Sequence, residues 1–376
     1  MRSRWFHTPV LHTPVEGYEK KASWLELFYD LIFVAAFIQL GNALSKHPDI
    51  PGFLAFAGLF VPLWISWTGF SFYMNRYTVD DFVHRVIVFV QMFAVGGMAV
   101  SAPHLLDGHH KGFAFAYAIA QLLVTVMYIR TWKQAADGRA YSKYWGGVFA
   151  LAGIVWFISI FIEPPWTYAF WAIGVALVFA SPFSKQSRAL TERFPIDHEH
   201  LSERYGLLAI IVLGESFVKV LTGLGEEGAA LGTFFQASVL LILTCCIWWI
   251  YFDDVAGSHI RQERFTPIIW LYAHLPLQIA ITASGVAIKK VVMIHSLTEP
   301  MKAEYRRLFA GTIGLTILSV TISGHDGTYG QTIYARHTYY PEDVQPGHQF
   351  VDNTSELPDG RIMIDYGMFH DTEPQP

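Results

Sequence analysis

The chain alternates between long apolar segments and short polar ones, and ten of the apolar segments reach, or nearly reach, the length that crosses a bilayer. About 20 apolar residues in an α-helix span the hydrocarbon core. The sequence therefore predicts an all-α polytopic membrane protein with about ten transmembrane helices. The predicted spans are residues 24–44, 50–75, 86–106, 112–129, 144–162, 164–184, 205–224, 228–252, 265–288 and 308–323.

The composition agrees with a membrane protein. Hydrophobic residues make up 53% of the chain and charged residues 15%, whereas a soluble domain carries about 25% charged residues. No basic cluster is interleaved with aromatic residues, so we expect no nucleic acid as a partner. The expected partners are the lipid bilayer, a small solute or ion, and further copies of the chain. The only cysteines, Cys245 and Cys246, are adjacent, a spacing that does not favour a structural disulfide.

The distribution of lysine and arginine predicts the orientation. With the N-terminus in the cytoplasm, the first five cytoplasmic segments carry sixteen basic residues, whereas the first four outer loops carry Lys46 and Lys111. Positive charge stays on the cytoplasmic side. Residues 1–23 are polar, contain no signal-peptide core, and are expected to form a cytoplasmic segment. The sequence thus predicts a multi-pass membrane protein with its N-terminus in the cytoplasm.

The connection after the ninth predicted span departs from this rule. It carries five basic residues on the predicted outer side, and three explanations remain open. The ninth run is re-entrant, the tenth is not a true span, or the loop tolerates its charge. The residues concerned are Lys289, Lys290, Lys302, Arg306 and Arg307.

The chain contains a faint internal repeat. Glu26 and Glu203 open two similar apolar helices, and each helix is followed by an aromatic-rich run that ends in paired aspartates. The offset of six predicted helices is even, so the two copies share one orientation, as in parallel transporter repeats. We expect a first repeat of six helices over residues 24–184 and a second of about four helices over residues 185–323, truncated or divergent.

Residues 324–376 form a polar tail without a spanning run. The tail is predicted to be either a small folded appendage or a disordered segment. Within it, ELPDGRIMID is typical of a short β-hairpin, because Pro-Asp-Gly favours a turn.

Three motifs in this order resemble the bacterial low temperature requirement protein A family, LtrA. They are ELFYDLIFV at 26–34, ERYGLLAIIVLGES at 203–216 and WWIYFDD at 248–254. The resemblance extends from about Trp24 to Lys290. It implies a multi-spanning protein of the bacterial cytoplasmic (inner) membrane. The family name records a cold-growth phenotype, and the resemblance brings no established catalytic residues. Similar proteins continue with more apolar helices where this chain has its polar tail.

Ionisable groups within the two related helices are the main functional candidates, because a buried charge in a membrane is costly. Glu26 and Asp30 are four residues apart and lie on one helix face. They are predicted to form an ion or proton site near the cytoplasmic mouth, since two close carboxylates can share a proton. In the alternative interpretation, Glu26 caps the helix and meets Lys20 or Lys21.

Glu215 and Lys219 are also four residues apart, and pairing them would lower the cost of burial. His274 could contribute to a proton path, although a core histidine satisfied by a carbonyl is the stronger expectation. The hypothetical solute or ion path consists of Asp30, Gln39, Glu215, Ser216, Lys219 and His274.

Charged residues at the helix ends form a second group of candidates. Asp81 and Arg85 have the spacing of a helical ion pair. A solvated anchor is the favoured interpretation, and a gate formed by ion pairs is the alternative. The group comprises Glu26, Asp80, Asp81, Arg85, Glu203, Arg204, Asp253 and Asp254.

Enzyme motifs and metal-ligand spacings are not recognisable. His198 and His200 alternate with acidic residues, but no second ligand pair follows at zinc spacing. The sequence therefore predicts no metal and no cofactor. It favours a transporter or channel for a small solute or ion over an enzyme. The alternatives are a non-transporting membrane protein that supports the envelope or cold adaptation, and a membrane-embedded enzyme.

Overall fold

The computed structural model describes residues 5–12, 14, 20–105, 108–227, 231–256, 266–292, 301–325, 354–356 and 362–364. These residues are helical almost throughout, and each of the ten predicted runs overlaps one long helix over most of its length. The long helices are α1 (Trp24–Lys46), α2 (Ile50–Arg76), α3 (Phe82–Ser101), α4 (Lys111–Gln134), α5 (Arg139–Ser159), α6 (Trp166–Ala180), α8 (His198–Glu227), α9 (Leu231–Tyr251), α10 (Thr266–Val292) and α11 (Ala303–His325).

Eight of these helices, some extended by a short 3-10 or π turn, are long and apolar enough to cross a membrane. The remaining two long helices are α5 and α11. Large apolar side chains such as Phe93 and Phe235 lie exposed on the outer surface of the bundle, where lipid rather than water would cover them. The prediction of an all-α polytopic membrane protein is confirmed.

Side-chain caps explain where several helices begin. At α1, Ser23 accepts a hydrogen bond from the backbone of Glu26, and the Glu26 carboxylate accepts one from the Ser23 backbone. This reciprocal pair is a capping box. Asp49 caps α2 and Asp81 caps α3 with a single bond each, in which a carboxylate oxygen accepts from the backbone N–H of Gly52 or His84.

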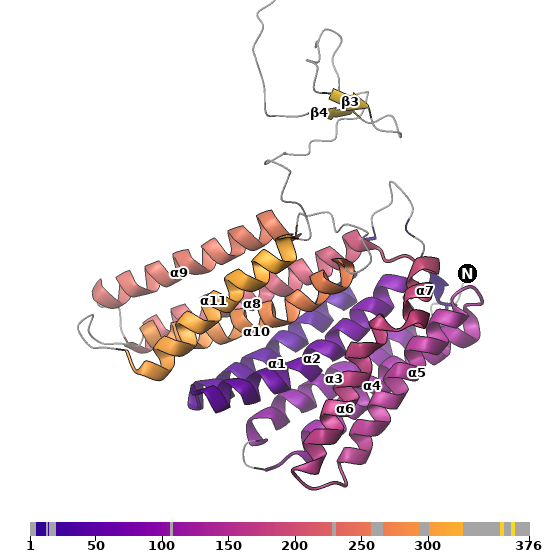
Figure 1. Ribbon diagram of the computed structural model, residues 1–376, viewed down its shortest axis with the longest axis horizontal. Helices are drawn as coiled ribbons and strands as arrows, with labels where there is room; N and C mark the ends of the chain where they lie inside the picture. The colour runs from indigo at the N-terminus through magenta and orange to yellow at the C-terminus, as the bar shows by residue number, and fades with distance from the viewer. Residues whose placement is uncertain are drawn as a thin grey trace, which may run out of the picture. The chain divides into compact units, whose positions relative to one another are not determined.

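Helices α8, α9, α10 and α11 gather on one side of the bundle and α1 to α6 on the other (Figure 1). Helix α1 packs against α2 and α3 of its own half and against α8 and α10 of the other half. Of the eight candidate spans, α10 has the largest buried share. The contact between the two groups therefore centres on α1, α8 and α10.

Helices α1 and α8 run in the same direction. Near their amino ends Asp30 contacts Arg204, and toward their carboxyl ends Gly41 lies against Lys219. Helix α8 packs against α9 and α10, as α1 packs against α2 and α3. This arrangement is what a parallel repeat requires, and the repeat itself stays a prediction.

Two elements in the described residues were not expected from the sequence. A short helix, α7 (Lys185–Arg193), follows the 3-10 turn η2 (Ser181–Phe183) between α6 and α8. The amino-terminal segment contributes strand β1 (Val10–Leu11), which pairs antiparallel with β2 (Tyr77–Thr78). Hydrogen bonds of His7 with Asp81, of His12 with Asp197 and of Ala22 with Glu203 hold the amino-terminal segment at the amino ends of α3 and α8.

In the polar tail, β3 (Thr354–Glu356) pairs antiparallel with β4 (Ile362–Ile364), with Glu356 opposite Ile362. The predicted hairpin at ELPDGRIMID is therefore confirmed for the described strands. The rest of residues 326–376 lies outside the described residues, so the two predictions for the tail stay open. Residues 328–376 form a unit separate from the helical bundle.

Candidate functional site

A buried cluster of charged side chains joins α1 to α8. The Arg204 guanidinium donates to Asp30 Oδ1 over 2.7 Å, and the Trp67 indole N–H donates to the same oxygen over 2.7 Å. The guanidinium carbon also lies 5.6 Å from the centre of the Trp67 ring. Both charged side chains are fully buried. Two residues from different halves of the sequence thus form one ion pair inside the bundle.

Glu26 extends this cluster toward the helix ends. Its Oε1 lies 3.9 Å from Arg204 Nε and 3.3 Å from His200 Nε2. Its other oxygen accepts from the Ser23 backbone over 2.8 Å. Glu26 therefore caps α1, as one interpretation of the sequence expected, and it also faces the buried charges. The ion or proton site stays a prediction. Lys20 donates to the carbonyl oxygens of Met74 and Tyr77.

Asn75 connects His200 to the Asp197 backbone. The Asp197 backbone fixes the Asn75 amide, because its N–H donates to Asn75 Oδ1 and its carbonyl accepts from Nδ2. Asn75 Nδ2 therefore faces His200 Nδ1 at 3.3 Å as a donor. Nδ1 of His200 therefore lies on the side of Asn75, and Nε2 lies on the side of Glu26.

The charges of the cluster do not balance. Among the fully buried side chains, Glu26 and Asp30 supply two carboxylates and Arg204 supplies one guanidinium. With both carboxylates ionised, these three side chains carry one excess negative charge, and the half-buried Lys20 is a further cation whose charge acts on Glu26. Asp30 Oδ2 and Glu26 Oε1 are both buried without a hydrogen-bond partner among the described residues, so each has acceptor capacity for a proton or a small cation.

Polar side chains continue from this cluster along α10. His274, Gln278 and Thr282 follow one another at intervals of four residues and therefore share one helix face. All three are buried, and neither amide atom of Gln278 has a hydrogen-bond partner in the described part of the chain. Farther along, Ser216 of α8 donates to the Ile281 carbonyl over 3.4 Å. We call the interface of α1, α8 and α10 that contains these groups the polar seam.

A second ion pair lies at the other end of the polar seam. Lys219 Nζ is 3.2 Å from Glu215 Oε1, and both side chains are nearly buried. Lys219 also lines a cavity of about 210 Å³ with Asn42, Ser45 and the carboxyl end of α10. Since α8 rises 1.5 Å per residue, Lys219 lies roughly 22 Å along the helix from Arg204. The two ion pairs therefore lie near opposite ends of the seam.

Gln39 and His274, two residues of the predicted path, do not have the unpaired, buried environment expected of a site within it. Gln39 is exposed on the outer face of α1, away from the seam. The His274 ring is hydrogen-bonded on both sides, with Nδ1 2.7 Å from the Trp270 carbonyl and Nε2 3.2 Å from the Tyr251 hydroxyl. His274 is thus a satisfied core histidine that also borders the seam.

The helix-end aspartates pair differently from the sequence expectation. Arg85 pairs with Asp80 at 2.8 Å on the surface, and not with Asp81. Asp81 instead accepts from both terminal nitrogens of Arg130 and from the backbone N–H groups of His7 and His84. The expected pair of Asp81 with Arg85 is wrong because Asp81 points into the bundle as the α3 cap.

The pKa of Asp81 reflects this environment. Burial alone would raise the pKa, but the hydrogen bonds from Arg130 and the two backbone N–H groups outweigh it and lower the pKa below its ordinary value. Lys20, outside the spans, shows the opposite balance. Its burial dominates the attraction of Glu26 and Asp197 and lowers the pKa of Lys20 to about 8.

The remaining candidates lie at the surface. Glu203 accepts from the backbone N–H of Ala22 over 3.1 Å and thereby holds the amino-terminal segment. Asp253 and Asp254 are exposed in the π-helical turn η3 (Phe252–Ala256) after α9, where Asp253 accepts from the Trp249 indole. Arg261, which the gate interpretation offers as a partner for these paired aspartates, lies outside the described residues. In the part of the chain that is described, no three His, Cys, Asp or Glu side chains are grouped closely enough to hold a metal ion.

Comparison with known proteins places the chain in a family. The model of the bacterial low temperature requirement A protein (LtrA) matches residues 21–339. An uncharacterized protein, RA0937 of Rhizobium meliloti, is 27% identical over 274 residues, which are 69% of this chain and 66% of that protein. The inward rectifier potassium channel Kirbac3.1 of Paramagnetospirillum magnetotacticum is 40% identical over 52 residues, 14% of this chain and 18% of the channel. No solved structure shows significant similarity. The family match covers most of the chain and includes the helices that carry the buried charges, so this protein belongs to the bacterial low temperature requirement A (LtrA) family.

Proposed function

We propose that this protein moves a small ion or solute across the membrane along the polar seam, with Asp30 as the site that binds a proton or a monovalent cation. The observation that carries the proposal is the charge imbalance of the cluster, in which two buried carboxylates face one guanidinium. An uncompensated charge within a membrane span is expensive. Binding a proton or a cation at the free carboxylate oxygens would neutralise it.

The rest of the seam supports a path. Buried polar groups without partners, such as the Gln278 amide, offer both donors and acceptors between the two ion pairs. The Lys219 cavity provides an opening at the far end. Intramembrane ionisable residues that face the interior of a bundle commonly mark ion or substrate pathways. The likeness to a potassium channel covers 14% of the chain and does not identify the ion.

The proposal also includes the orientation of the protein in the membrane and the identity of that membrane. We infer that the amino ends of α1 and α8 face the cytoplasm of a bacterium, because the basic residues concentrate at that end. In this orientation the Asp30 cluster lies near the cytoplasmic mouth, with Asp30 roughly 9 Å inside the start of α1.

Flux through liposomes that contain the full chain tests the proposal. We expect the wild type to dissipate an imposed proton, sodium or potassium gradient. Asp30→Asn and Glu215→Gln should each lower the rate to that of protein-free liposomes, since they keep the shape and remove the charge. Lys219→Met should be milder if Lys219 only neutralises Glu215.

Gln39→Leu is the matched control, because it removes a polar group from α1 on the face away from the seam. It should leave the rate unchanged. Tryptophan fluorescence and gel filtration would establish that every variant is folded. If both amide variants keep the full rate, or if the wild type carries none of these ions, the proposal fails and a non-transporting role is favoured.

A further inference from the structure

A second cavity, unrelated to the polar seam, lies between α2, α5, α7 and α10. Its volume is about 920 Å³, which is within the range of pockets that bind drug-sized ligands. Helix α2 separates it from the Asp30 cluster. Trp67 and Ser71 face the cluster, whereas Trp64, Thr68 and Phe72 line the cavity.

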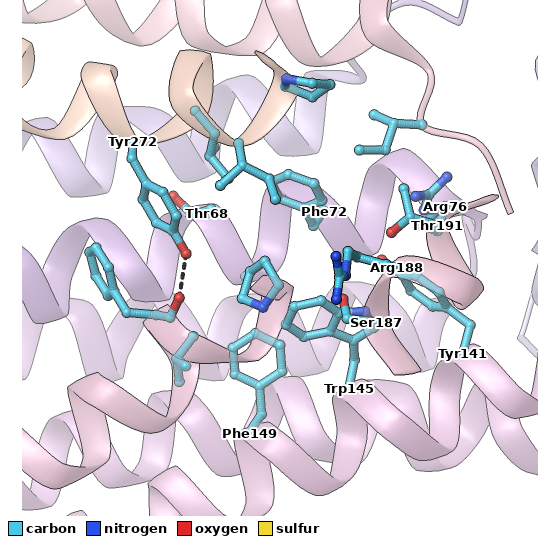
Figure 2. A pocket seen from close by; sticks show the side chains of 18 of the residues that line it. Thr68, Phe72, Arg76, Tyr141, Trp145, Phe149, Ser187, Arg188, Thr191 and Tyr272 are labelled. Carbon is cyan, nitrogen blue, oxygen red and sulfur yellow. Dashed lines mark hydrogen bonds between the residues drawn. The ribbon is translucent and has the colours of Figure 1, made fainter. Parts of the chain in front are cut away.

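The two ends of this cavity differ in chemistry. Figure 2 shows Arg76, Arg188 and Ser187 together at one end, and Phe149 and Tyr272 toward the other. Three permanently cationic side chains line the cavity, Arg76, Arg188 and Lys185, against one carboxylate, Glu192. The remaining wall is mainly aromatic and aliphatic. Such a shape suits a ligand that has an anionic head and an apolar body.

Buried hydrogen-bond donors without acceptors indicate which groups the anionic head of the ligand must supply. Arg76 is 1% exposed, and its Nε has no acceptor among the described residues. Its other contacts are a hydrogen bond to the Pro195 carbonyl and the Tyr141 ring 5.0 Å away. The indole N–H of Trp145 is also buried and has no acceptor among the residues that the structure describes. Buried donors that lack acceptors are costly, so a ligand with several oxygen acceptors would relieve both.

We propose that this cavity binds an anionic phospholipid, with its phosphate against Arg76, Arg188 and the Trp145 N–H and an acyl chain along Phe72 and Phe149. Guanidinium groups bind phosphate strongly through charge-assisted hydrogen bonds. Basic pockets between spanning helices are a recognised class of lipid-headgroup site. The bilayer also supplies this ligand directly. The proposal is independent of transport, since none of these residues belongs to the polar seam.

Native mass spectrometry of the full chain in detergent tests the proposal, with dioleoyl phosphatidylglycerol and dioleoyl phosphatidylcholine as probes. We expect the anionic lipid to bind about tenfold more tightly than the zwitterionic one. Arg188→Gln should abolish this preference, since Arg188 is half-buried and lines the cavity. Arg193→Gln is the matched control. Arg193 lies on the same helix, is exposed and does not line the cavity, so this change should preserve the preference.

Trp145→Phe provides a second variant that keeps an aromatic ring in place and removes one donor. It should weaken phosphatidylglycerol binding several-fold and leave phosphatidylcholine binding unchanged. Equal affinity of the wild type for the two lipids would overturn the proposal. Equal losses in Arg188→Gln and Arg193→Gln would overturn it too, because general surface charge would then explain the binding. Displacement of phosphatidylglycerol by millimolar inorganic phosphate would reassign the cavity to a soluble phosphate and thus also contradict the lipid assignment.

Discussion

Asp81 pairs with Arg130, 49 residues away, although Arg85 lies one helical turn after it. The Asp81 side chain is fully buried and that of Arg130 nearly so. Removing one partner of a buried ion pair costs about 3–5 kcal/mol, because the other charge is left uncompensated. We therefore expect Arg130→Met to lower the free energy of unfolding by about 3 kcal/mol, measured by thermal unfolding in detergent.

The same pair predicts a dependence of stability on pH. The folded state lowers the pKa of Asp81 from its ordinary value of 3.8, so the folded state binds this proton more weakly than the unfolded state. The stabilisation is therefore complete above pH 3.8 and is lost as the pH falls through the lowered pKa. In Arg130→Met, the free energy of unfolding should therefore fall less than in the wild type as the pH drops below 3.8. Identical acid profiles for the wild type and Arg130→Met would contradict the assignment.

At the residue scale the sequence predicted which side chains are unusual but not their partners. Glu26, Asp30 and Arg204 stand out because charges are rare in apolar helices. Nothing in the sequence indicates that Arg204 lies opposite Asp30, because that contact depends on how α1 meets α8. Trp67, Asn75 and His200 complete the cluster. Trp67 was missed because an aromatic residue in a spanning helix has no distinguishing pattern.

At the scale of elements, close packing of α8 on α10 positions the polar seam. A methyl group added at Gly285 would lie 2.7 Å from Ser216 Oγ and 3.3 Å from Ser216 Cα. Since a backbone atom cannot give way as a flexible side chain can, Gly285→Ala should force the two helices apart. We expect a loss of about 1–3 kcal/mol in the free energy of unfolding, measured in detergent.

Gly214→Ala is the control for this prediction. Gly214 also lies within α8, but nothing lies within 4 Å of a methyl group added there. Alanine favours a helix by roughly 0.5–1 kcal/mol over glycine, so this variant should be neutral or slightly more stable. A Gly285→Ala protein as stable as Gly214→Ala would show that α8 and α10 do not pack this closely.

The helices themselves could be predicted well because each apolar run is long and bounded by polar residues. The short helix α7 could not, since its sequence, KQSRALTER, contains few apolar residues and reads as a connection. Its polar face nevertheless supplies part of the lining of the 920 Å³ cavity. The strand β1 was equally hidden, because two residues are too few to show an alternating pattern.

At the scale of the whole molecule, the orientation can be tested by labelling. Glu163 and Arg139 lie near opposite ends of α5, and both are exposed. With the N-terminus in the cytoplasm, a cysteine in place of Glu163 should react in intact cells with a thiol reagent that does not cross membranes. A cysteine in place of Arg139 should react only after the cells are opened. Both tests need a Cys245→Ala, Cys246→Ala background, because these native cysteines are exposed and free. The reverse labelling pattern would invert the proposed orientation.

The central claim is that ions or solutes pass along the polar seam, and a block placed in the seam tests it most directly. Ser216 is buried at the contact of α8 with α10, whereas its neighbour Phe217 is exposed on the outer face of α8. In the cysteine-free background, Ser216→Cys liposomes should conduct until a bulky cationic thiol reagent is added. Modification should then reduce the flux to that of protein-free liposomes, while Phe217→Cys liposomes keep their rate. Full flux through completely modified Ser216→Cys protein would contradict the account.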